Sequence, residues 1–358
     1  MKDLHGGNIY KFQREGKNNI LDYSSNINPL GVPQKFIDIA KENFDKLVNY
    51  PDPYYIELRK KISEFNSVNM DNIIVGNGAT EILFLYIRAL KPKKVLILAP
   101  CFAEYERALK SVSAKIEYFE LKESDHFYPN IINLKKEVEN DNYDLLLFCN
   151  PNNPTGQFIK LEDIKEIVKT CENKNTRIFI DEAFIEFIEN WKEKTVSLLK
   201  NKNIFIMRAF TKFFAIPGLR LGYGIGFDDE ILRKMWEEKE PWTVNTFANL
   251  AGLIMLDDKE YIEKSEKWIL EEKKFMYKEL NEFQYINAYK TECNFILIKI
   301  YNISSASLRD KMIEKNILIR DASNFKFLDY HFVRLAIKDR KSNLKMLEVL
   351  ADIMEYRG

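Results

Sequence analysis

The middle of the chain alternates short apolar runs with stretches of helical spacing. The apolar runs are about 4–6 residues long, which is typical of strands buried on both faces of a sheet. They are Ile73–Val75, Val95–Leu98, Lys115–Phe119, Asp144–Cys149, Arg177–Ile180, Asn203–Met207 and Leu221–Ile225. Helical spacing between them is clear in Ile82–Leu90 and Leu161–Cys171. This alternation predicts an α/β unit in which helices cover both faces of a mostly parallel sheet.

Beyond residue 240 the pattern changes to an α+β arrangement. A charged amphipathic stretch from Lys259 to Phe283 predicts a long linking helix. Further strands are predicted at Asn294–Ile300, Ile317–Arg320 and Phe332–Ala336, and further helices at Ser304–Lys315 and Ser342–Met354. We therefore expect an arm with part of a small domain (1–45), a large α/β domain (46–250), and a linking helix with a small α+β domain (251–358).

Composition disfavours several classes of protein. Of 358 residues, 46% are hydrophobic and 30% charged, as in an ordinary globular protein. Lys and Arg number 54, as do Asp and Glu, and this zero net charge disfavours a nucleic-acid binder. No apolar run is long enough to span a bilayer, and the polar start has no signal core. The four cysteines and three histidines lack disulfide or metal-ligand spacing, so we expect a cytoplasmic protein without metal.

Residues just after the predicted strands are the candidates for chemistry, because open parallel sheets bind ligands at the carboxyl ends of their strands. Gly76–Glu81 follows the first strand and opens a helix. Its glycines permit a tight turn, and the free N–H groups near Ala79 and Thr80 would form an anion cradle. A plain tight connection is the alternative.

Two further segments end buried strands. Asn150–Gly156 contains two prolines that fix the backbone and could aim an Asn amide, although a plain Asn-Pro turn would look the same. Asp181 directly follows Arg177–Ile180, where a carboxylate is costly unless it meets a cation or a donor. A helix N-cap is the alternative for Asp181.

The fourth segment contains Lys212 between Thr211 and two phenylalanines, followed by Arg220. Desolvation by aromatic neighbours would lower the pKa of the amine and make it a Schiff-base nucleophile. The alternative is a lysine whose stem covers apolar surface. The four segments together suit pyridoxal 5′-phosphate: an acid for its pyridinium nitrogen, an amine for its aldehyde, a cradle for its phosphate and an amide for its ring hydroxyl.

On these motifs the whole chain resembles the fold type I, or class I/II aminotransferase, family of pyridoxal-phosphate enzymes. The resemblance implies a large domain with a mostly parallel seven-stranded sheet and a smaller α+β domain. It implies that Lys212 forms the Schiff base and that Asp181 pairs with the pyridine nitrogen. The other implied cofactor-binding residues are Gly78, Ala79, Thr80, Phe102, Asn153, Thr211, Arg220 and Tyr50. Because Tyr50 matches a tyrosine that reaches the neighbouring subunit's cofactor, the resemblance also implies a homodimer.

Two positions depart from the usual family pattern. Phe184 stands where many relatives have a tyrosine that contacts the ring oxygen, so that hydrogen bond should be missing. Ala209 stands where a phosphate-binding Ser or Thr is common, which raises the expected importance of Thr211 and Arg220.

The N-terminal motif His5–Ile9, the segment Asp22–Gly31, Phe184 and Pro241–Asn245 are similar to the threonine-phosphate decarboxylases of the corrinoid (cobalamin) pathway, a group within this family. That similarity implies decarboxylation of L-threonine O-3-phosphate to (R)-1-amino-2-propanol O-2-phosphate and CO₂, with Lys212 as proton donor. The implied substrate-binding residues are His5, Gly6, Asn26, Asn153, Arg320 and Arg334. Cationic donors of this kind suit a substrate with two anionic groups.

Several alternatives stay open at the level of sequence. His5 could belong to a disordered terminus, and Arg320 could form a surface ion pair with Asp321. A histidinol-phosphate aminotransferase shares the cofactor and a phosphorylated substrate, and serine phosphate differs from threonine phosphate by one methyl group. A non-enzymatic effector-sensing module on the same fold is disfavoured, because no DNA-binding domain precedes His5. Which cation meets which anion is also open.

Overall fold

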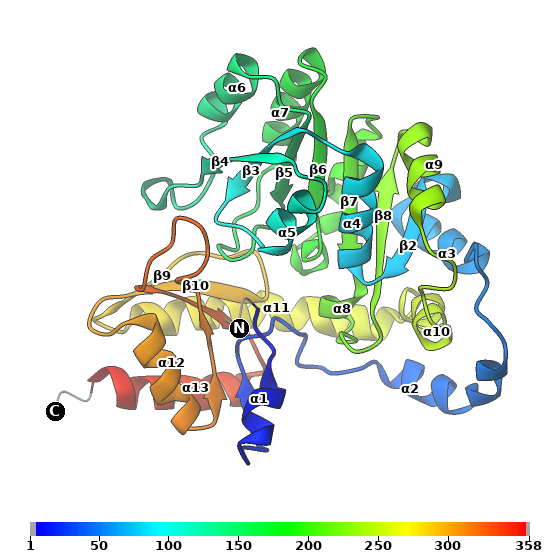
Figure 1. Cartoon of the computed structure of the whole chain (residues 1–358). Coiled ribbons are helices and arrows are strands. Elements are labelled where there is room, and N and C mark those ends of the chain that lie inside the picture. The colour runs from blue at the N-terminus through cyan, green and yellow to red at the C-terminus, as the bar shows by residue number, and fades with distance from the viewer. Residues whose placement is uncertain (1–4, 356–358) are drawn as a thin grey trace.

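The computed structural model describes residues 5–355 and contains a large and a small β-sheet with helices packed around them (Figure 1). The helix α11 (Lys259–Asn281) runs along both parts and contacts the small sheet as well as the large domain. Its first turn is capped by the Asp258 side chain, which accepts from the Tyr261 backbone N–H. The long helix predicted from Lys259 to Phe283 is therefore present and ends two residues earlier, at Asn281.

The large sheet has seven strands and is mostly parallel, as expected from the family resemblance. Their order is β2 (Ile73–Asn77), β8 (Leu221–Gly226), β7 (Ile204–Ala209), β6 (Arg177–Asp181), β5 (Leu145–Cys149), β3 (Lys94–Ala99) and β4 (Lys115–Glu120). β8 runs antiparallel to the other six strands. The register places Cys149 beside Asp181 and Asp181 beside Met207, so the carboxyl ends of three central strands meet at one edge.

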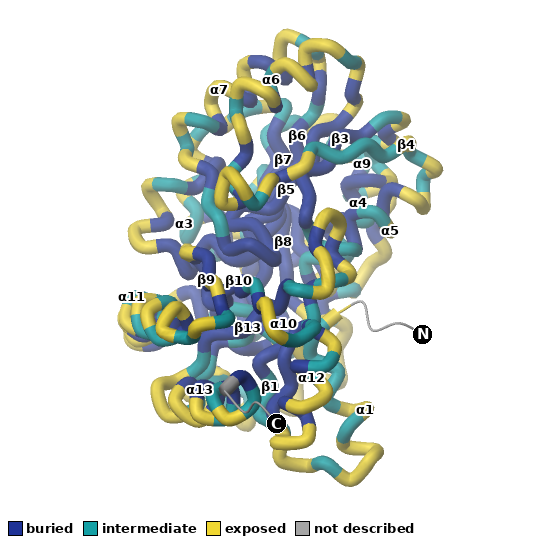
Figure 2. Tube along the Cα trace, turned by 90° about the vertical axis from the view of Figure 1, so that its left-hand side faces the viewer, coloured by how far each residue is buried: buried dark blue, intermediate teal, exposed yellow. Residues whose placement is uncertain are grey.

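Continuous apolar sequence produces these strands because both faces of the sheet are covered. In β5, Leu145 and Leu147 pack in one apolar cluster, whereas Leu146 and Phe148 pack in the cluster on the other face. The edge strand β4 is the exception, since its residues are partly or fully exposed. Figure 2 shows the buried strands as a continuous interior with exposed helices and loops around them.

The helices of the large part pack against its strands or against one another. They are α3 (Ile56–Asn66), α4 (Ala79–Leu90), α5 (Glu104–Lys110), α6 (Ile131–Asn140), α7 (Leu161–Asn173), α8 (Phe210–Phe213), α9 (Asp229–Glu238) and α10 (Thr246–Met255). Near the N-terminus lie α1 (Ile9–Arg14) and α2 (Gln34–Lys41). The short 3-10 helices are η1 (Phe44–Val48), η2 (Met70–Asn72), η3 (Glu123–Asp125), η4 (Ile185–Phe187), η5 (Trp191–Glu193) and η6 (Val196–Leu199).

The small sheet is antiparallel and is packed with two helices. Its order is β12 (Arg320–Asp321), β13 (Phe332–Ala336), β10 (Phe295–Ile300) and β9 (Ile286–Ala288), and the helices are α12 (Ser305–Glu314) and α13 (Arg340–Glu355). A separate parallel pair joins β1 (Leu21–Asp22) to β11 (Ile317–Leu318). The N-terminal segment is thereby attached to the small part of the chain.

The single strand predicted at Ile317–Arg320 is wrong in one respect. The chain forms two short strands there, because β11 pairs with β1 whereas β12 pairs with β13. The strand β9 was not predicted. It has only three residues, which is too short for alternating buried and exposed positions to form a recognisable sequence pattern. Among residues 5–355, no helix combines the length and the apolar character that crossing a membrane requires.

Candidate active site

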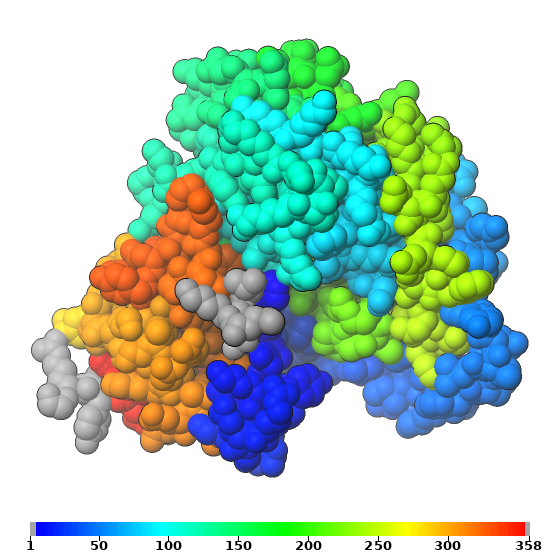
Figure 3. Space-filling model, in the orientation of Figure 1, coloured from blue at the N-terminus to red at the C-terminus, as the bar shows by residue number. Residues whose placement is uncertain are grey.

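A cavity of about 550 Å³ lies where the carboxyl ends of β5, β6 and β7 face the small sheet and the N-terminal segment. In Figure 3 that segment, in dark blue, lies between the orange residues of the small part and the green residues near α8. Every site residue predicted from the sequence lines this cavity except Gly78 and Tyr50. The predicted residues that line it are His5, Gly6, Asn26, Ala79, Thr80, Phe102, Asn153, Asp181, Thr211, Lys212, Arg220, Arg320 and Arg334.

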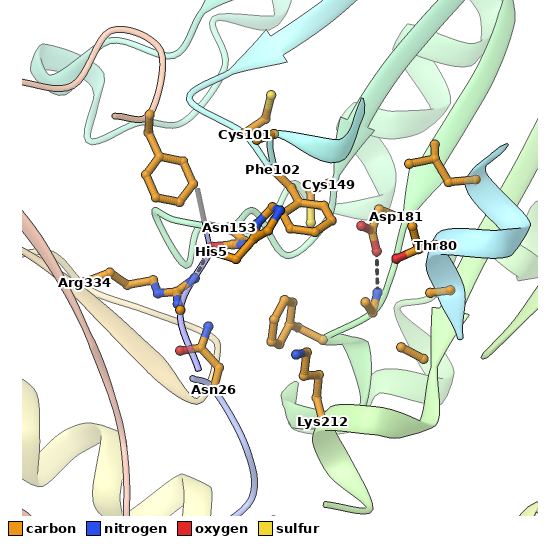
Figure 4. Close-up of a pocket in the computed structure, with 18 of the residues that line it drawn as sticks. His5, Asn26, Thr80, Cys101, Phe102, Cys149, Asn153, Asp181, Lys212 and Arg334 are labelled. Atoms are coloured by element: carbon orange, nitrogen blue, oxygen red, sulfur yellow. Dashed lines mark hydrogen bonds between the residues drawn. The ribbon is translucent and has the colours of Figure 1, made fainter. Parts of the chain in front are cut away.

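Lys212 lies in the short helix α8, immediately after β7, and its amine points into the cavity (Figure 4). The neighbouring Phe210, Phe213 and Phe214 are buried. Burial lowers the pKa of Lys212 to about 8, and the nearby cations Arg334 and Arg220 act in the same direction. The desolvated amine predicted from its aromatic neighbours is therefore present.

Asp181 ends β6 and is almost fully buried. Its Oδ1 accepts from the Ala183 backbone N–H at 2.8 Å, and its Oδ2 accepts from the Tyr105 hydroxyl at 2.6 Å. Burial raises the pKa of Asp181 to about 6, although both hydrogen bonds oppose that shift. The carboxylate thus accepts from the backbone of the following turn and lines the cavity, but it is not a helix N-cap, because the N-cap position of η4 is Phe184.

The turn predicted to form an anion cradle lies at the start of α4, with Gly78 at the N-cap position. Gly78 has φ +80°, and a Cβ at this position would lie 2.4 Å from Arg220 Nη2. A Cβ at Gly222 would lie 2.3 Å from the Ala79 backbone nitrogen, so both glycines permit close approach. Ala79, Thr80 and Arg220 consequently gather at one corner of the cavity.

Asn153 and Arg334 meet across the cavity from opposite parts of the fold. Arg334 Nη1 donates to Asn153 Oδ1 at 2.6 Å, and Arg334 Nη2 donates to the Ser24 carbonyl at 2.6 Å. The buried Arg334 Nε has no hydrogen-bond partner among residues 5–355. Burial, reinforced by Arg320, lowers the pKa of Arg334 to about 9. The other two asparagines of the turn, Asn150 and Asn152, form hydrogen bonds with backbone groups, as expected of a plain Asn-Pro turn.

The N-terminal arm lies inside the site. His5 Nε2 and Glu104 Oε1 are 2.8 Å apart, and the His5 and Phe102 rings are 5.3 Å apart (Figure 4). The Gly7 backbone N–H donates to Ser24 Oγ at 2.8 Å. The disordered-terminus alternative for His5 is therefore wrong.

Arg320 is also buried at the site. Its Nη1 donates to the Asp321 carbonyl at 2.6 Å and its Nη2 to Asn324 Oδ1 at 2.8 Å, while Phe325 packs 5.1 Å from the guanidinium. The surface ion pair between Arg320 and the Asp321 carboxylate is accordingly wrong. Asn26 is buried nearby, and its Oδ1 has no hydrogen-bond partner in the described part of the chain.

The two departures from the family pattern both face the cavity. Phe184 packs edge-on against Phe295, with ring centroids 5.1 Å apart, and supplies no hydroxyl. Ala209 likewise presents only a methyl group. Tyr50 lies outside this cavity, 81% exposed, with its ring 4.9 Å from that of Trp242.

Sequence reasoning missed several residues of the site. Tyr105 was not among the predicted site residues, and its role becomes visible only in its hydrogen bond to Asp181. Asn324, Phe325 and Lys326 line the cavity from a loop after β12. Polar residues in a loop that follows a strand were a usable signal for Asn324 and Lys326.

The residues fit pyridoxal 5′-phosphate in their donors and charges. The N–H groups of Ala79 and Thr80 have no acceptor within residues 5–355, as an awaiting anion requires. Phe102 offers an aromatic face, and Lys212 and Asp181 offer an amine and a carboxylate in the same cavity. The cavity is thus shaped and charged for a phosphorylated aromatic aldehyde.

Comparison with known proteins gives consistent results. A model of the family "Aminotransferase class I and II" matches residues 18–350. A protein of Caldanaerobacter subterraneus subsp. tengcongensis, provisionally named threonine-phosphate decarboxylase, is 43% identical over 98% of this chain and 94% of the relative. The threonine-phosphate decarboxylase of Salmonella typhimurium is 33% identical over 98% of this chain and 96% of its own. The crystal structure of the histidinol-phosphate aminotransferase from Clostridium acetobutylicum has a TM-score of 0.88 at 38% identity, covering 94% of this chain and 99% of its own.

Proposed function

The chain belongs to the class I and II aminotransferase family of pyridoxal-phosphate-dependent enzymes, and from this premise we propose that it decarboxylates L-threonine O-3-phosphate. The reaction consumes one proton and yields CO₂ and (R)-1-amino-2-propanol O-2-phosphate, a building block in cobalamin biosynthesis. The observation that carries this proposal is the N-terminal arm held in the cavity by His5 and Gly7. The same motif, with Phe184, distinguishes the decarboxylase group in sequence.

The residues around the cavity support the cofactor-binding roles in this proposal. When bound, pyridoxal phosphate supplies an electron sink for the bond that breaks at Cα of the substrate. The Lys212 amine would condense with its aldehyde group, releasing water, Asp181 would hold its ring nitrogen protonated, and Asn153 Nδ2 would donate to its ring hydroxyl. Phe102 would offer an aromatic face to the ring. The phosphate would be held by Gly78, Ala79, Thr80, Thr211 and Arg220.

Substrate binding uses the cations on the other side of the cavity. Arg334 binds the substrate carboxylate in this proposal. Its buried Nε–H has no hydrogen-bond partner among residues 5–355, and its guanidinium is oriented by the hydrogen bond from Nη1 to Asn153 Oδ1. His5 and Arg320 bind the phosphate of the substrate, with Gly6 and Asn26 completing the pocket. Once the amino group of the substrate has displaced Lys212 from the cofactor, Lys212 Nζ would be free as an ammonium group and could deliver to Cα the proton that replaces CO₂.

Histidinol-phosphate aminotransferase is the second candidate function. The similarity to the solved enzyme of that name supports it, and Arg320 and Arg334 suit its phosphorylated substrate as well. A decarboxylase needs no amino acceptor, whereas an aminotransferase stops after one half-reaction without one.

The two functions are separated by an assay of carboxyl-labelled L-threonine O-3-phosphate without any keto acid. We expect many equivalents of labelled CO₂ per subunit and no dependence on 2-oxoglutarate. Absence of CO₂, with turnover of histidinol phosphate that requires 2-oxoglutarate, would replace the proposal by the aminotransferase. Serine phosphate in the same assay measures selectivity for the methyl group, for which we expect about 10–100-fold.

A homodimer and a cytoplasmic location belong to the same proposal. Phe44, Leu47, Val48, Tyr50, Tyr54 and Trp242 are exposed although apolar or aromatic. Such a surface suits a second copy of the chain, into whose site Tyr50 would reach. The cysteines, all unpaired, suit a reducing compartment.

A further inference from the structure

A buried ion pair lies behind the turn to which we assign the cofactor phosphate. Lys239 Nζ is 3.1 Å from Glu81 Oε1, and the two side chains are 2% and 18% exposed. Lys239 follows α9, whereas Glu81 lies in the first turn of α4, 158 residues earlier. Burying a charged lysine to this degree costs free energy unless an opposite charge compensates for the lost solvation.

Glu81 shapes the turn by bending back over its own helix terminus. Its Oε2 accepts from the Asn77 backbone N–H, in the manner of the acidic residue of a capping box. The Gly78 N–H donates to the Gly76 carbonyl, and the Glu81 N–H donates to the Gly78 carbonyl. Within residues 5–355, this leaves the N–H groups of Ala79 and Thr80 available for an anion.

This arrangement creates an electrostatic conflict. The carboxylate of Glu81 directly follows the two residues that would bind a phosphate dianion, so the two negative charges repel each other. Lys239 is the cation in contact with Glu81. Burial lowers the pKa of Lys239, but Glu81 opposes that shift, and Glu240 adds a weaker stabilising charge.

Lys239 is also fixed from its other side. Its amine donates to the Thr243 hydroxyl and lies 5.8 Å from the centre of the Tyr55 ring. The Tyr55 hydroxyl accepts from the Val244 backbone N–H at 3.1 Å. The amine is therefore held at Glu81 by the Thr243 hydroxyl and the Tyr55 ring, and Tyr55 is itself bonded to the residue after Thr243.

We propose that Lys239 is a positioning residue for cofactor binding: it neutralises Glu81, so that Glu81 can shape the phosphate-binding turn without repelling the phosphate. The proposal rests on the assigned role of Gly78–Thr80 in the proposed function. It predicts that loss of the Lys239 charge weakens binding of the phosphate group in particular.

The test compares the full-length apoenzyme and its variants in binding pyridoxal 5′-phosphate and pyridoxal, followed by absorbance without substrate. We expect Lys239→Met to weaken binding of pyridoxal phosphate by about 10-fold or more, while pyridoxal affinity changes by less than about twofold. Adding Glu81→Gln to that variant should restore affinity to within about threefold of the wild type. Lys264→Met, which removes the exposed pair with Glu260, is the matched control and should change neither affinity.

If Lys239→Met lost affinity for pyridoxal phosphate and for pyridoxal to the same extent, or lost none, the proposed role of Lys239 would be overturned. If Lys239→Met does not fold, Lys239→Gln and the Glu81→Gln/Lys239→Met double variant allow the same comparison. If the wild type itself binds both ligands equally, the assigned phosphate turn fails together with this proposal. If it discriminates but releases no CO₂, only the proposed decarboxylation fails.

Discussion

Burial acts on single residues of this site in opposite directions. It raises the pKa of Asp181 to about 6 and lowers the pKa of Lys212 to about 8, because each charged form loses solvation. Near neutral pH, Asp181 is therefore mostly ionised, while a usable fraction of Lys212 is a neutral amine. A carboxylate and a nucleophilic amine thus coexist in one cavity.

The lowered pKa of Lys212 predicts how the apoenzyme captures its cofactor. The neutral amine is the nucleophile, so the rate should rise with pH, level off above about 8 and fall at lower pH. Stopped-flow absorbance of apoenzyme mixed with pyridoxal phosphate at different pH values measures this rate. A rate that continues to rise to about pH 10, as for an ordinary lysine, would contradict the desolvated amine.

Arg334 should be irreplaceable even by lysine. Lysine keeps a positive charge but cannot bond Asn153 and the Ser24 carbonyl together while offering a further N–H to a carboxylate. We expect Arg334→Lys to lower kcat/KM for threonine phosphate by about 10–100-fold, as loss of a charged hydrogen bond does. Arg309→Lys, at a partly exposed pair with Asp310, is the control and should have little effect; equal losses in the two variants would refute the role of Arg334.

Residue types revealed the chemistry of the site better than they revealed its contacts. The desolvation of Lys212 follows from its immediate aromatic neighbours and could be predicted. The Tyr105–Asp181 bond joins residues 76 positions apart, and the Arg334–Asn153 bond joins residues 181 apart. Such pairs depend on how the strands and the two parts of the chain come together, which local sequence does not encode.

The strands and turns could be predicted because buried strands appear in the sequence as continuous apolar runs that end at turn residues. The seven strands of the large sheet were located by their apolar runs, and the polar residues at their carboxyl ends do line the cavity. The division of Ile317–Arg320 into β11 and β12 was not predictable, since it results from a change of partner strand. The position of the N-terminal arm could not be predicted from the local sequence either, because it depends on contacts with Ser24 and Glu104.

The arm provides a prediction at the scale of an element. A Cβ at Gly6 would lie 2.0 Å from the Ser24 backbone oxygen, so Gly6→Ala must displace the arm together with His5. We expect kcat/KM to fall by about 10-fold or more, as for other misplaced binding groups, while pyridoxal phosphate still binds. Steady-state kinetics and absorbance of the bound cofactor measure the two effects. Gly218→Ala, where a Cβ would meet open space, should behave as the wild type; unchanged kinetics in Gly6→Ala would show that the arm plays no part.

At the scale of the whole molecule, the exposed aromatic surface around Tyr50 predicts that the sites are shared between two copies. Tyr50→Ala should weaken cofactor binding, and Lys212→Ala should abolish activity. In the proposed dimer, a mixture of the two variants would contain one intact site, because Tyr50 of one copy would complete the site that holds Lys212 of the other. At limiting pyridoxal phosphate, activity should therefore rise above that of either variant when the two are unfolded and refolded together, and light scattering should give the mass of a dimer. Mixtures no more active than their parents would contradict the shared site.

The proposed function depends most on one covalent bond, between Lys212 and the aldehyde carbon of the cofactor. Reduction of the holoenzyme with borohydride fixes that bond, and mass spectrometry of the digested protein locates it. We predict a phosphopyridoxyl group on the peptide that contains Lys212, and no colour or adduct in Lys212→Arg. An adduct on a different lysine, or a colourless wild type that gives no adduct, would contradict the assignment of the site and the function built on it.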